Sequence, residues 1–168
     1  MAWQKRVLRV DLTNGTCNEE PLNMEWAMQY LGQRGLASRY LAEEIDPKVD
    51  ALSPENKLIM VTGPLTGTTA STGGRYSVVT KSPLTGAIAC SNSGGFIGAE
   101  MKNAGWDMFI FEGKSEKPVY LHVENLKAQL LRADELWGKS VWETDEILHN
   151  VHQDPLAKIA CVGRSAEQ

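Results

Sequence analysis

A stretch of 44 residues without a carboxylate constrains this chain more than any other feature of its sequence. No Asp or Glu occurs from Asn56 to Ala99, although the chain of 168 residues holds 21 acids and an even distribution would place about five or six there. The only charged residues of the stretch are Lys57, Arg75 and Lys81. Because an unpaired carboxylate beside a buried anion is costly, this composition indicates a polyanionic ligand.

Small residues fill the same stretch. Residues 63–98 contain eight of the fifteen glycines and eleven Ser or Thr residues. Glycine permits close backbone approach, hydroxyls add small donors, and runs of free N–H groups bind phosphate oxygens. Arg75 follows two glycines and can make a bidentate contact. The segment Ser91–Gly95 lies between a predicted strand and a predicted helix, where helix N–H groups suit phosphate. A loop pair that packs only on itself is the alternative.

Neither nucleotide-binding glycine motif is present. The chain has no Gly-x-x-x-x-Gly-Lys-Ser/Thr and no Gly-x-Gly-x-x-Gly. One other repeat occurs, since Pro-Leu-Thr-Gly at 64–67 recurs at 83–86, each copy directly after a predicted strand. We expect the two loops to lie side by side at one sheet edge and consider an internal duplication.

Periodicity and turn residues predict more strands than helices. Alternation, Asn14-Gly15 and Asn23 indicate a hairpin followed by a capped helix. We expect strands at 5–11, 16–20, 57–62, 75–80, 87–91, 106–112, 119–123, 128–132 and 158–162, and helices at 23–31, 36–45, 96–104 and 140–151. We further expect 106–112 and 119–123 to pair as a hairpin. These patterns predict an α+β fold with mixed, largely antiparallel sheets and a few helices.

Composition excludes several classes of protein. A net charge of −4 argues against nonspecific nucleic-acid binding, and no apolar run approaches the length of a membrane span. With no signal-peptide pattern, we expect a soluble, cytoplasmic protein. Cys17, Cys90 and Cys161 are far apart, so we expect reduced thiols and no disulfide framework. The last residues, 163–168, look like an interruption, and we expect a piece of a longer protein.

Several motifs of the chain resemble the N-terminal domain of the aldehyde:ferredoxin oxidoreductase family. They are Gly-Pro-Leu-Thr-Gly-Thr from Gly63, Thr-Gly-Gly-Arg-Tyr-Ser-Val-Val-Thr-Lys-Ser-Pro-Leu-Thr-Gly from Thr72, and Ser-Asn-Ser-Gly-Gly-Phe from Ser91. The flanks at 52–58, 112–120 and 136–139 fit as well. The resemblance implies that 1–168 is an N-terminal pterin-binding domain that forms the base for a bis-pterin cofactor.

The resemblance also implies an activity and its cofactors. These are a tungsten or molybdenum ion on two pterins (tungstopterin or molybdopterin), a 4Fe-4S cluster with ligands outside this chain, and magnesium. The reaction is oxidation of an aldehyde to a carboxylic acid, with electrons passed to ferredoxin or an iron-sulfur electron-transfer subunit. We expect an oligomer, contacts with further domains of the same enzyme, no nucleic acid and no membrane. By itself this chain should be inactive.

Site residues carry over only where the motifs match. The resemblance implies that Arg75 bridges pterin and cluster, and that Asn92, Ser93, Gly94 and Gly95 bind the pterin. The main-chain carbonyl of Asn92 would help to bind magnesium between the pterin phosphates. No catalytic residue is assigned in this chain. The segment 163–167 departs from the family's Gly-Pro-Ala-Gly-Glu, so no role is transferred to it.

Alternative functions and sites stay open. A related tungsten enzyme, such as the catalytic subunit of a benzoyl-CoA reductase, and a non-catalytic phosphate- or nucleotide-binding module are both compatible with the sequence. His149 and His152 are three apart on a predicted helix and could share a metal, although exposed helix histidines are commoner. Arg34 could reach an anion. Nothing beyond charge marks Lys81.

Overall fold

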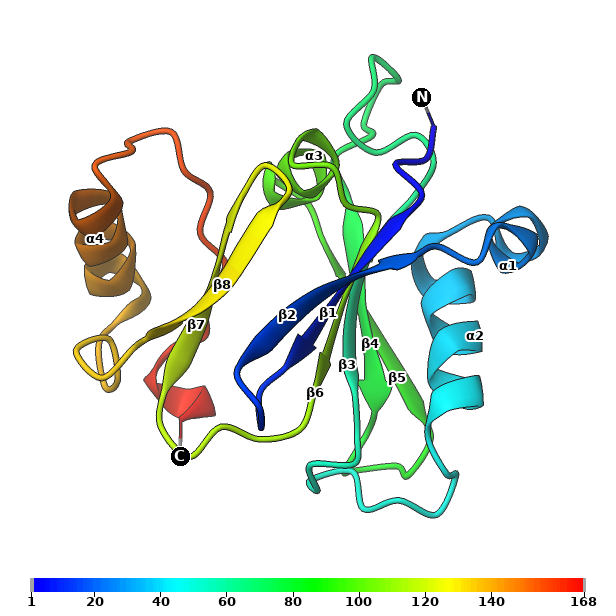
Figure 1. Ribbon diagram of the computed structural model, residues 1–168, viewed down its shortest axis with the longest axis horizontal. Helices are drawn as coiled ribbons and strands as arrows, with labels where there is room; N and C mark the ends of the chain where they lie inside the picture. Colours follow the sequence, from blue (N-terminus) through cyan, green and yellow to red (C-terminus); the bar gives the residue numbers. More distant parts are fainter. Residues whose placement is uncertain (1, 168) are drawn as a thin grey trace.

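The fold is a six-stranded mixed sheet with two helices on one face, and a third helix and a two-stranded hairpin on the other (Figure 1). The computed structural model describes residues 2–167. The elements are β1 (Arg6–Asp11), β2 (Thr16–Pro21), α1 (Met24–Tyr30), α2 (Gln33–Glu44), β3 (Leu58–Thr62), β4 (Tyr76–Lys81), β5 (Ile88–Ser93), α3 (Ile97–Asn103), β6 (Met108–Glu112), β7 (Val119–Glu124), β8 (Lys127–Arg132), α4 (Val141–His152) and the 3₁₀ helix η1 (Arg164–Ala166). None of these helices has the length and apolarity of a membrane span.

The main sheet has the strand order β2-β1-β6-β3-β4-β5. The pairs β1–β2, β3–β6, β3–β4 and β4–β5 are antiparallel, and β1–β6 is parallel. Strands β7 and β8 form a separate antiparallel pair. The predicted α+β class, with mixed and largely antiparallel sheets, is confirmed.

Local signals explain where several elements begin. Gly15 has a φ of +68° in the β1–β2 turn, and the Asp11 carboxylate accepts hydrogen bonds from the N–H groups of Thr13 and Asn14. Asn23 caps α1 by accepting from the N–H of Trp26. These are the residue types that favour a hairpin turn and a helix start, so the sequence specifies both features locally.

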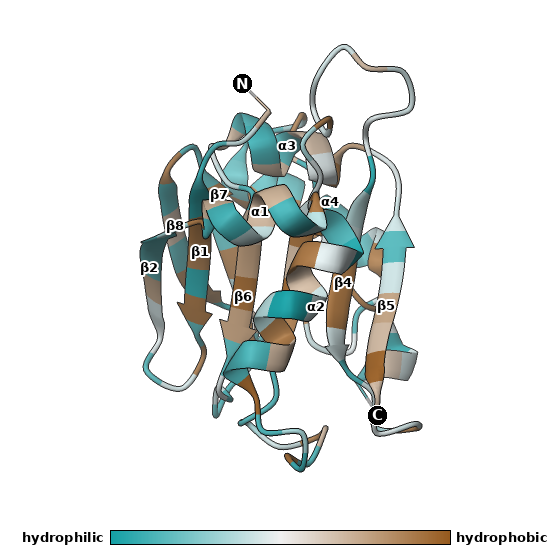
Figure 2. Ribbon diagram, turned by 90° about the vertical axis from the view of Figure 1, so that its right-hand side faces the viewer, coloured by the Kyte–Doolittle hydropathy of each residue, from teal (hydrophilic) through white to brown (hydrophobic). Residues whose placement is uncertain are grey.

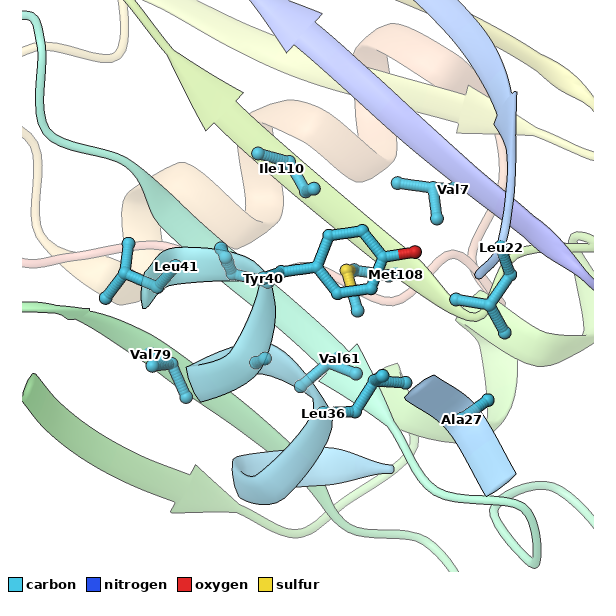
Figure 3. Close-up of a cluster of buried hydrophobic side chains, with 12 residues drawn as sticks. Val7, Leu22, Ala27, Leu36, Tyr40, Leu41, Val61, Val79, Met108 and Ile110 are labelled. Carbon is cyan, nitrogen blue, oxygen red and sulfur yellow. The ribbon is translucent and has the colours of Figure 1, made fainter. Parts of the chain in front are cut away.

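Helices α1 and α2 cover one face of the sheet (Figure 2). Apolar side chains of the two helices and of the strands point toward one another there (Figure 3). The buried members are Val7, Leu22, Ala27, Leu36, Ala37, Tyr40, Leu41, Ile59, Val61, Val79, Met108 and Ile110. Burial of this apolar area is the main driving force for docking the helices on the sheet.

An ionic network fixes the C-terminal end of α2 on the same face. Arg9 forms ion pairs with Glu20, Glu44 and Glu112, and Lys57 pairs with Glu44 and Glu112. Partial burial opposes ionisation of Glu44, but the hydrogen bonds from Arg9 and Lys57 hold the pKa of this carboxyl below its usual value. One cation of the acid-free stretch, Lys57, is therefore neutralised by carboxylates from outside the stretch.

The opposite face is covered by α3 and by the β7–β8 hairpin (Figure 1). Its buried centre is Leu8, Val10, Met101, Trp106 and Phe109, and Leu121, Val123 and Leu130 of the hairpin pack against it. Beneath α3, buried Lys102 pairs with fully buried Asp107, which also accepts hydrogen bonds from the N–H groups of Gln4 and Lys5. The pair ties the N-terminal segment to β6.

Two expectations about strands were wrong. Residues 106–112 do not form a hairpin with 119–123, because β6 lies inside the main sheet between β1 and β3, and β7 pairs with β8. The first three residues of β6 are buried, as befits a strand with neighbours on both sides. Within the described part of the chain, residues 158–162 form no strand, because no neighbour pairs with this mostly exposed segment.

The two Pro-Leu-Thr-Gly loops do not lie side by side. The first follows β3 and the second follows β4, and because β3 and β4 are antiparallel the loops lie at opposite ends of the sheet. Their environments differ accordingly. Thr66 of the first copy is buried, whereas Thr85 of the second is exposed. The loop 63–75 projects beyond the end of the sheet near the N-terminus (Figure 1).

Candidate functional site

The predicted site residues lie at the open edge of the main sheet. Among residues 2–167, strand β5 pairs only with β4, and nearly all of its residues are exposed. Arg75 directly precedes β4, and Asn92 pairs in register with Ser77 of β4. As a result Arg75 and Asn92, seventeen residues apart in sequence, meet in space: Arg75 Nη1 donates to Asn92 Oδ1 at 2.6 Å. The structure therefore brings together two residues that the motifs singled out.

The three cations of the acid-free stretch have different partners. Lys57 forms ion pairs with Glu44 and Glu112. Lys81 Nζ donates to the main-chain carbonyls of Pro47 and Val49. Over residues 2–167 no carboxylate lies within ion-pair distance of Arg75, whose guanidinium contacts only the neutral Asn92 amide. Arg75 is thus the cation of this stretch whose charge remains available to a ligand.

The backbone at Arg75 is tightly enclosed, in contrast to its side chain. Gln33 Nε2 and Thr66 Oγ1 both donate to the Arg75 carbonyl, at 3.3 and 3.1 Å. A Cβ at Gly98, in the first turn of α3, would lie 2.7 Å from the Gly74 carbonyl oxygen. Glycine at position 98 therefore lets α3 approach the Gly74–Arg75 backbone closely.

The other predicted residues lie around a hollow of about 500 Å³. Ser93, Gly94 and Gly95 line it together with Tyr76 and Phe96, and its other wall comes from α4 and residues 157–161. Successive strand side chains point to opposite faces, so Ser93 faces away from Asn92. The predicted set is consequently divided, because Arg75 and Asn92 do not line this hollow.

Charge distinguishes the two faces as possible anion sites. The hollow has Asp145 and His149 of α4 and Lys158 on its wall, so it includes a carboxylate. The Arg75–Asn92 face offers a guanidinium and an amide. Gly94 and Gly95, which line the hollow, leave open space where a Cβ would stand, so a group can approach their backbone. A phosphate-bearing organic group fits the Arg75–Asn92 face better than the hollow.

The two histidines considered as metal ligands make hydrogen bonds within the fold instead. His149 Nδ1 lies 2.7 Å from the Asp154 carbonyl oxygen, while His152 Nε2 lies 3.0 Å from the Tyr120 hydroxyl and its ring stacks on His122. His149 and His152 therefore do not converge on one metal. In the described residues no three His, Cys, Asp or Glu side chains form a metal-binding group, and the three cysteines are free. Exposed Arg34 stays untested as an anion contact.

Sequence reasoning missed Gln33 and Thr66, the two residues that contact the Arg75 carbonyl. Signals for both were present. Thr66 belongs to the repeated Pro-Leu-Thr-Gly, and Gln33 follows Gly32 at the start of α2, next to the candidate anion contact Arg34. Their shared contact depends on the folding together of α2, the 63–75 loop and β4, so no local pattern reveals it.

The fold and site define an α+β domain with an acid-free, arginine-bearing edge, a class suited to supporting an anionic cofactor. The family described as "Aldehyde ferredoxin oxidoreductase, N-terminal domain" matches residues 7–168. The chain belongs to this family of oxidoreductases and corresponds to its N-terminal domain, which confirms the resemblance.

Sequence relatives include tungsten-containing aldehyde ferredoxin oxidoreductases. Those of Pyrococcus abyssi and Pyrococcus furiosus are 53% identical over 165 residues and 50% identical over 162. The matches cover 98% and 96% of this chain but 27% of each relative. The chain thus spans about a quarter of the length of the relatives it matches.

A solved structure shares the fold. It is the active-site complex BamBC of benzoyl-coenzyme A reductase with 1,5-dienoyl-CoA, which matches with a TM-score of 0.94 and 40% sequence identity. The match covers 96% of this chain and 25% of that one. At this identity the likeness extends beyond fold to the sequence of the domain.

Proposed function

We propose that residues 1–168 form the pterin-supporting N-terminal domain of a tungsten-dependent aldehyde oxidoreductase. The enzyme would oxidise aldehydes to carboxylic acids and pass the electrons to ferredoxin or another redox partner. The names of relatives about 50% identical support the metal and the substrate class. The observation that carries the proposal is the contact between Arg75 and Asn92 on an acid-free edge, where the guanidinium has no carboxylate partner among residues 2–167.

The chain's own residues would bind and orient the cofactor. Arg75 would offset the negative charge of the pterin phosphates and dithiolenes, and as a hydrogen-bond donor to sulfur it would influence a neighbouring cluster's potential. Ser93, Gly94 and Gly95 would lie along the pterin, and the Asn92 carbonyl would share a magnesium ion with phosphate oxygens, a ligand type that magnesium prefers. When bound, the tungstopterin supplies the two-electron redox chemistry.

Groups outside this chain would complete the site. The cysteines of a 4Fe-4S cluster and the residues that move protons are not assigned to this chain, whose three cysteines are far apart in sequence. We therefore propose that this domain contributes placement and electrostatics, that activity requires the further domains of the enzyme, and that the enzyme is an oligomer.

A benzoyl-CoA reductase catalytic subunit is the second candidate. It is favoured by the TM-score of 0.94 to the BamBC complex. Identity is lower, however, at 40% against 53% for the aldehyde oxidoreductase of Pyrococcus abyssi. Because the fold is common to both, substrate class must be decided by assay.

Elemental and cofactor analysis of the complete enzyme tests the proposal. We expect tungsten, iron, magnesium and an organic pterin in the purified protein, and reduction of ferredoxin or a viologen dye with an aldehyde as donor. Turnover with benzoyl-CoA in place of an aldehyde would favour the second candidate. A protein prepared under tungsten-replete, anaerobic conditions that contains neither pterin nor tungsten nor molybdenum would exclude both.

A further inference from the structure

The main-chain carbonyl of Arg75 is held by side chains from two separate elements. Gln33 Nε2, at the start of α2, donates to it at 3.3 Å, and Thr66 Oγ1, in the 63–75 loop, donates at 3.1 Å. The same Thr66 hydroxyl accepts from the N–H of Gly63 at 3.0 Å. A hydroxyl has one proton to donate, and buried Thr66 donates it to the Arg75 carbonyl oxygen.

Gln33, which donates to the Arg75 carbonyl, has an energetically unfavourable left-handed backbone conformation. Gln33 has a φ of +45° and follows Gly32 with a φ of +106°. A non-glycine residue in the left-handed region costs roughly 1–2 kcal/mol, and such strain clusters at functional sites. A Cβ at Gly63 would lie 3.4 Å from Gln33 Cγ and Nε2, so the amide rests on the Gly63 backbone. The Gln33 side chain is therefore aimed at the carbonyl from a packed position.

The first turn of α3 packs against the same backbone from a third side. A Cβ at Gly98 would lie 2.7 Å from the Gly74 carbonyl oxygen, 3.2 Å from Thr66 Cγ2 and 3.3 Å from the Arg75 carbonyl carbon. The first turn of α3 thus presses on the Gly74–Arg75 peptide and on the Thr66 methyl group. Gln33, Thr66 and Gly98 come from three elements, yet all contact the two peptide units on either side of the Arg75 Cα.

The Arg75 side chain contrasts with this fixed backbone. It is exposed, and within residues 2–167 its guanidinium donates only to Asn92. A long side chain has several rotatable bonds, and holding its backbone origin restricts the volume that its charged end can reach. The fixed Arg75 backbone therefore limits the positions that the guanidinium can occupy.

We propose that Gln33 and Thr66 are positioning residues that clamp the Arg75 carbonyl and so hold its guanidinium beside Asn92, facing the anionic cofactor. This inference rests on the proposed function. It also accounts for the unequal environments of the two Pro-Leu-Thr-Gly copies, because only the first copy supplies a buried threonine to the site. Thr85 of the second copy is exposed, and its hydroxyl accepts from the N–H of Ala87 at 3.3 Å.

The experiment compares matched substitutions in the complete enzyme. Thr66→Val and Gln33→Met keep side-chain size but remove the donors, Thr66→Ser keeps the hydroxyl, and Thr85→Val makes the same change in the other copy. The readout is the pterin retained per protein after gel filtration, measured by fluorescence of the oxidised pterin after denaturation. We expect Thr66→Val and Gln33→Met each to retain pterin about five-fold less well, the equivalent of one hydrogen bond. Thr66→Ser and Thr85→Val should match the wild type.

A double variant separates positioning from simple loop stability. If Thr66 acts through Arg75, Thr66→Val combined with Arg75→Ala should retain no less pterin than Arg75→Ala alone. Additive loss would overturn the clamp. So would pterin loss in Thr85→Val equal to that in Thr66→Val, or wild-type retention in both Thr66→Val and Gln33→Met.

The same series distinguishes failure of the clamp from failure of the proposed function. Wild-type pterin in Arg75→Ala would remove the role of Arg75 and the clamp with it. Loss of pterin in Arg75→Ala with full retention in both clamp variants would overturn the clamp alone. Should Thr66→Val fold poorly, Gln33→Met decides the matter, because Gln33 is only half-buried.

Discussion

Arg75 Nη1 and Asn92 Oδ1 lie 2.6 Å apart and join the start of β4 to the edge strand β5. The acceptor is a neutral amide, which orients the guanidinium without cancelling its charge. An arginine kept in this state can contact an anionic group through its remaining N–H donors. The relationship gives Arg75 a role that differs from those of Lys57 and Lys81 in the same stretch.

Arg75→Ala should lower pterin and tungsten content at least about ten-fold, since a hydrogen bond to a charged group contributes roughly 1.5–3 kcal/mol. Arg75→Lys should give an intermediate loss, because lysine keeps the charge but not the planar fork. Both contents are measured on the purified complete enzyme. Arg132→Ala is the control, as Arg132 is exposed and pairs with Asp134 on the far hairpin. Full cofactor content in Arg75→Ala would contradict the assigned role.

The sequence predicts those parts of the fold that depend on neighbouring residues. Asn14-Gly15 and Asn23 act within a few positions, and both features form as expected. The position of β6 between β1 and β3 depends instead on which strands share an apolar face. A strand whose sequence is apolar on both faces carries no local signal for which strands it pairs with. Apart from the strand expected at 158–162, local patterns therefore predicted the strands and helices but not the strand order.

The site shows the same limit. Motifs identified Arg75 and Asn92, and the structure places them in contact, whereas Ser93 lies on the opposite face because strand side chains alternate. That division was predictable from alternation alone. The contact of Thr66 with Arg75 was not, since Thr66 and Thr85 have identical local sequences and differ only in their tertiary surroundings.

Lys81→Ala should affect stability and not cofactor content. Lys81 Nζ donates to the carbonyls of Pro47 and Val49, so its loss frees the turn between α2 and β3. We expect the free energy of unfolding to fall by roughly 1–2 kcal/mol, as for a charged hydrogen-bond donor at a partly exposed site. Urea denaturation measures the change, with exposed Lys48→Ala as the control. A loss of pterin as large as in Arg75→Ala would show that Lys81 belongs to the cofactor site.

Asp107→Asn should be strongly destabilising. Asp107 is fully buried, pairs with buried Lys102 and accepts from the N–H groups of Gln4 and Lys5. Removal of its charge leaves the Lys102 ammonium buried without a counter-ion, which costs about 3–5 kcal/mol. Thermal and urea denaturation check the loss, and the exposed Asp134→Asn should leave both unchanged.

A second variant tests the cause of that destabilisation. Lys102→Met combined with Asp107→Asn removes the uncompensated charge, so it should be more stable than Asp107→Asn alone. A double variant that is less stable than either single one would show that packing, and not the buried charge, dominates at this position.

The stacked imidazoles of His122 and His152 should make the docking of α4 sensitive to pH. The rings are 4.2 Å apart with an interplanar angle of 2°, and the Tyr120 hydroxyl lies 3.0 Å from His152 Nε2. Burial lowers the pKa of His122 below 6.5, and the neighbouring His152 lowers it further, while Glu124 partly opposes the shift. A histidine with a depressed pKa in the folded state binds fewer protons than in the unfolded state. Its stabilising contribution is therefore complete above pH 6.5 and is lost as the pH falls below that value.

Hydrogen exchange of the α4 amides between pH 8 and pH 5, corrected for the intrinsic pH dependence of exchange, measures this effect. Protection should fall below pH 6.5 in the wild type, because protonation of His122 places a charge in a partly buried ring stack. His122→Phe keeps an aromatic ring that cannot be charged, so protection should stay constant with pH. Glu124→Gln removes the opposing carboxylate, which lowers the pKa of His122 further and should deepen the loss at low pH. A wild-type profile in His122→Phe would mean that α4 is held by contacts independent of this pair.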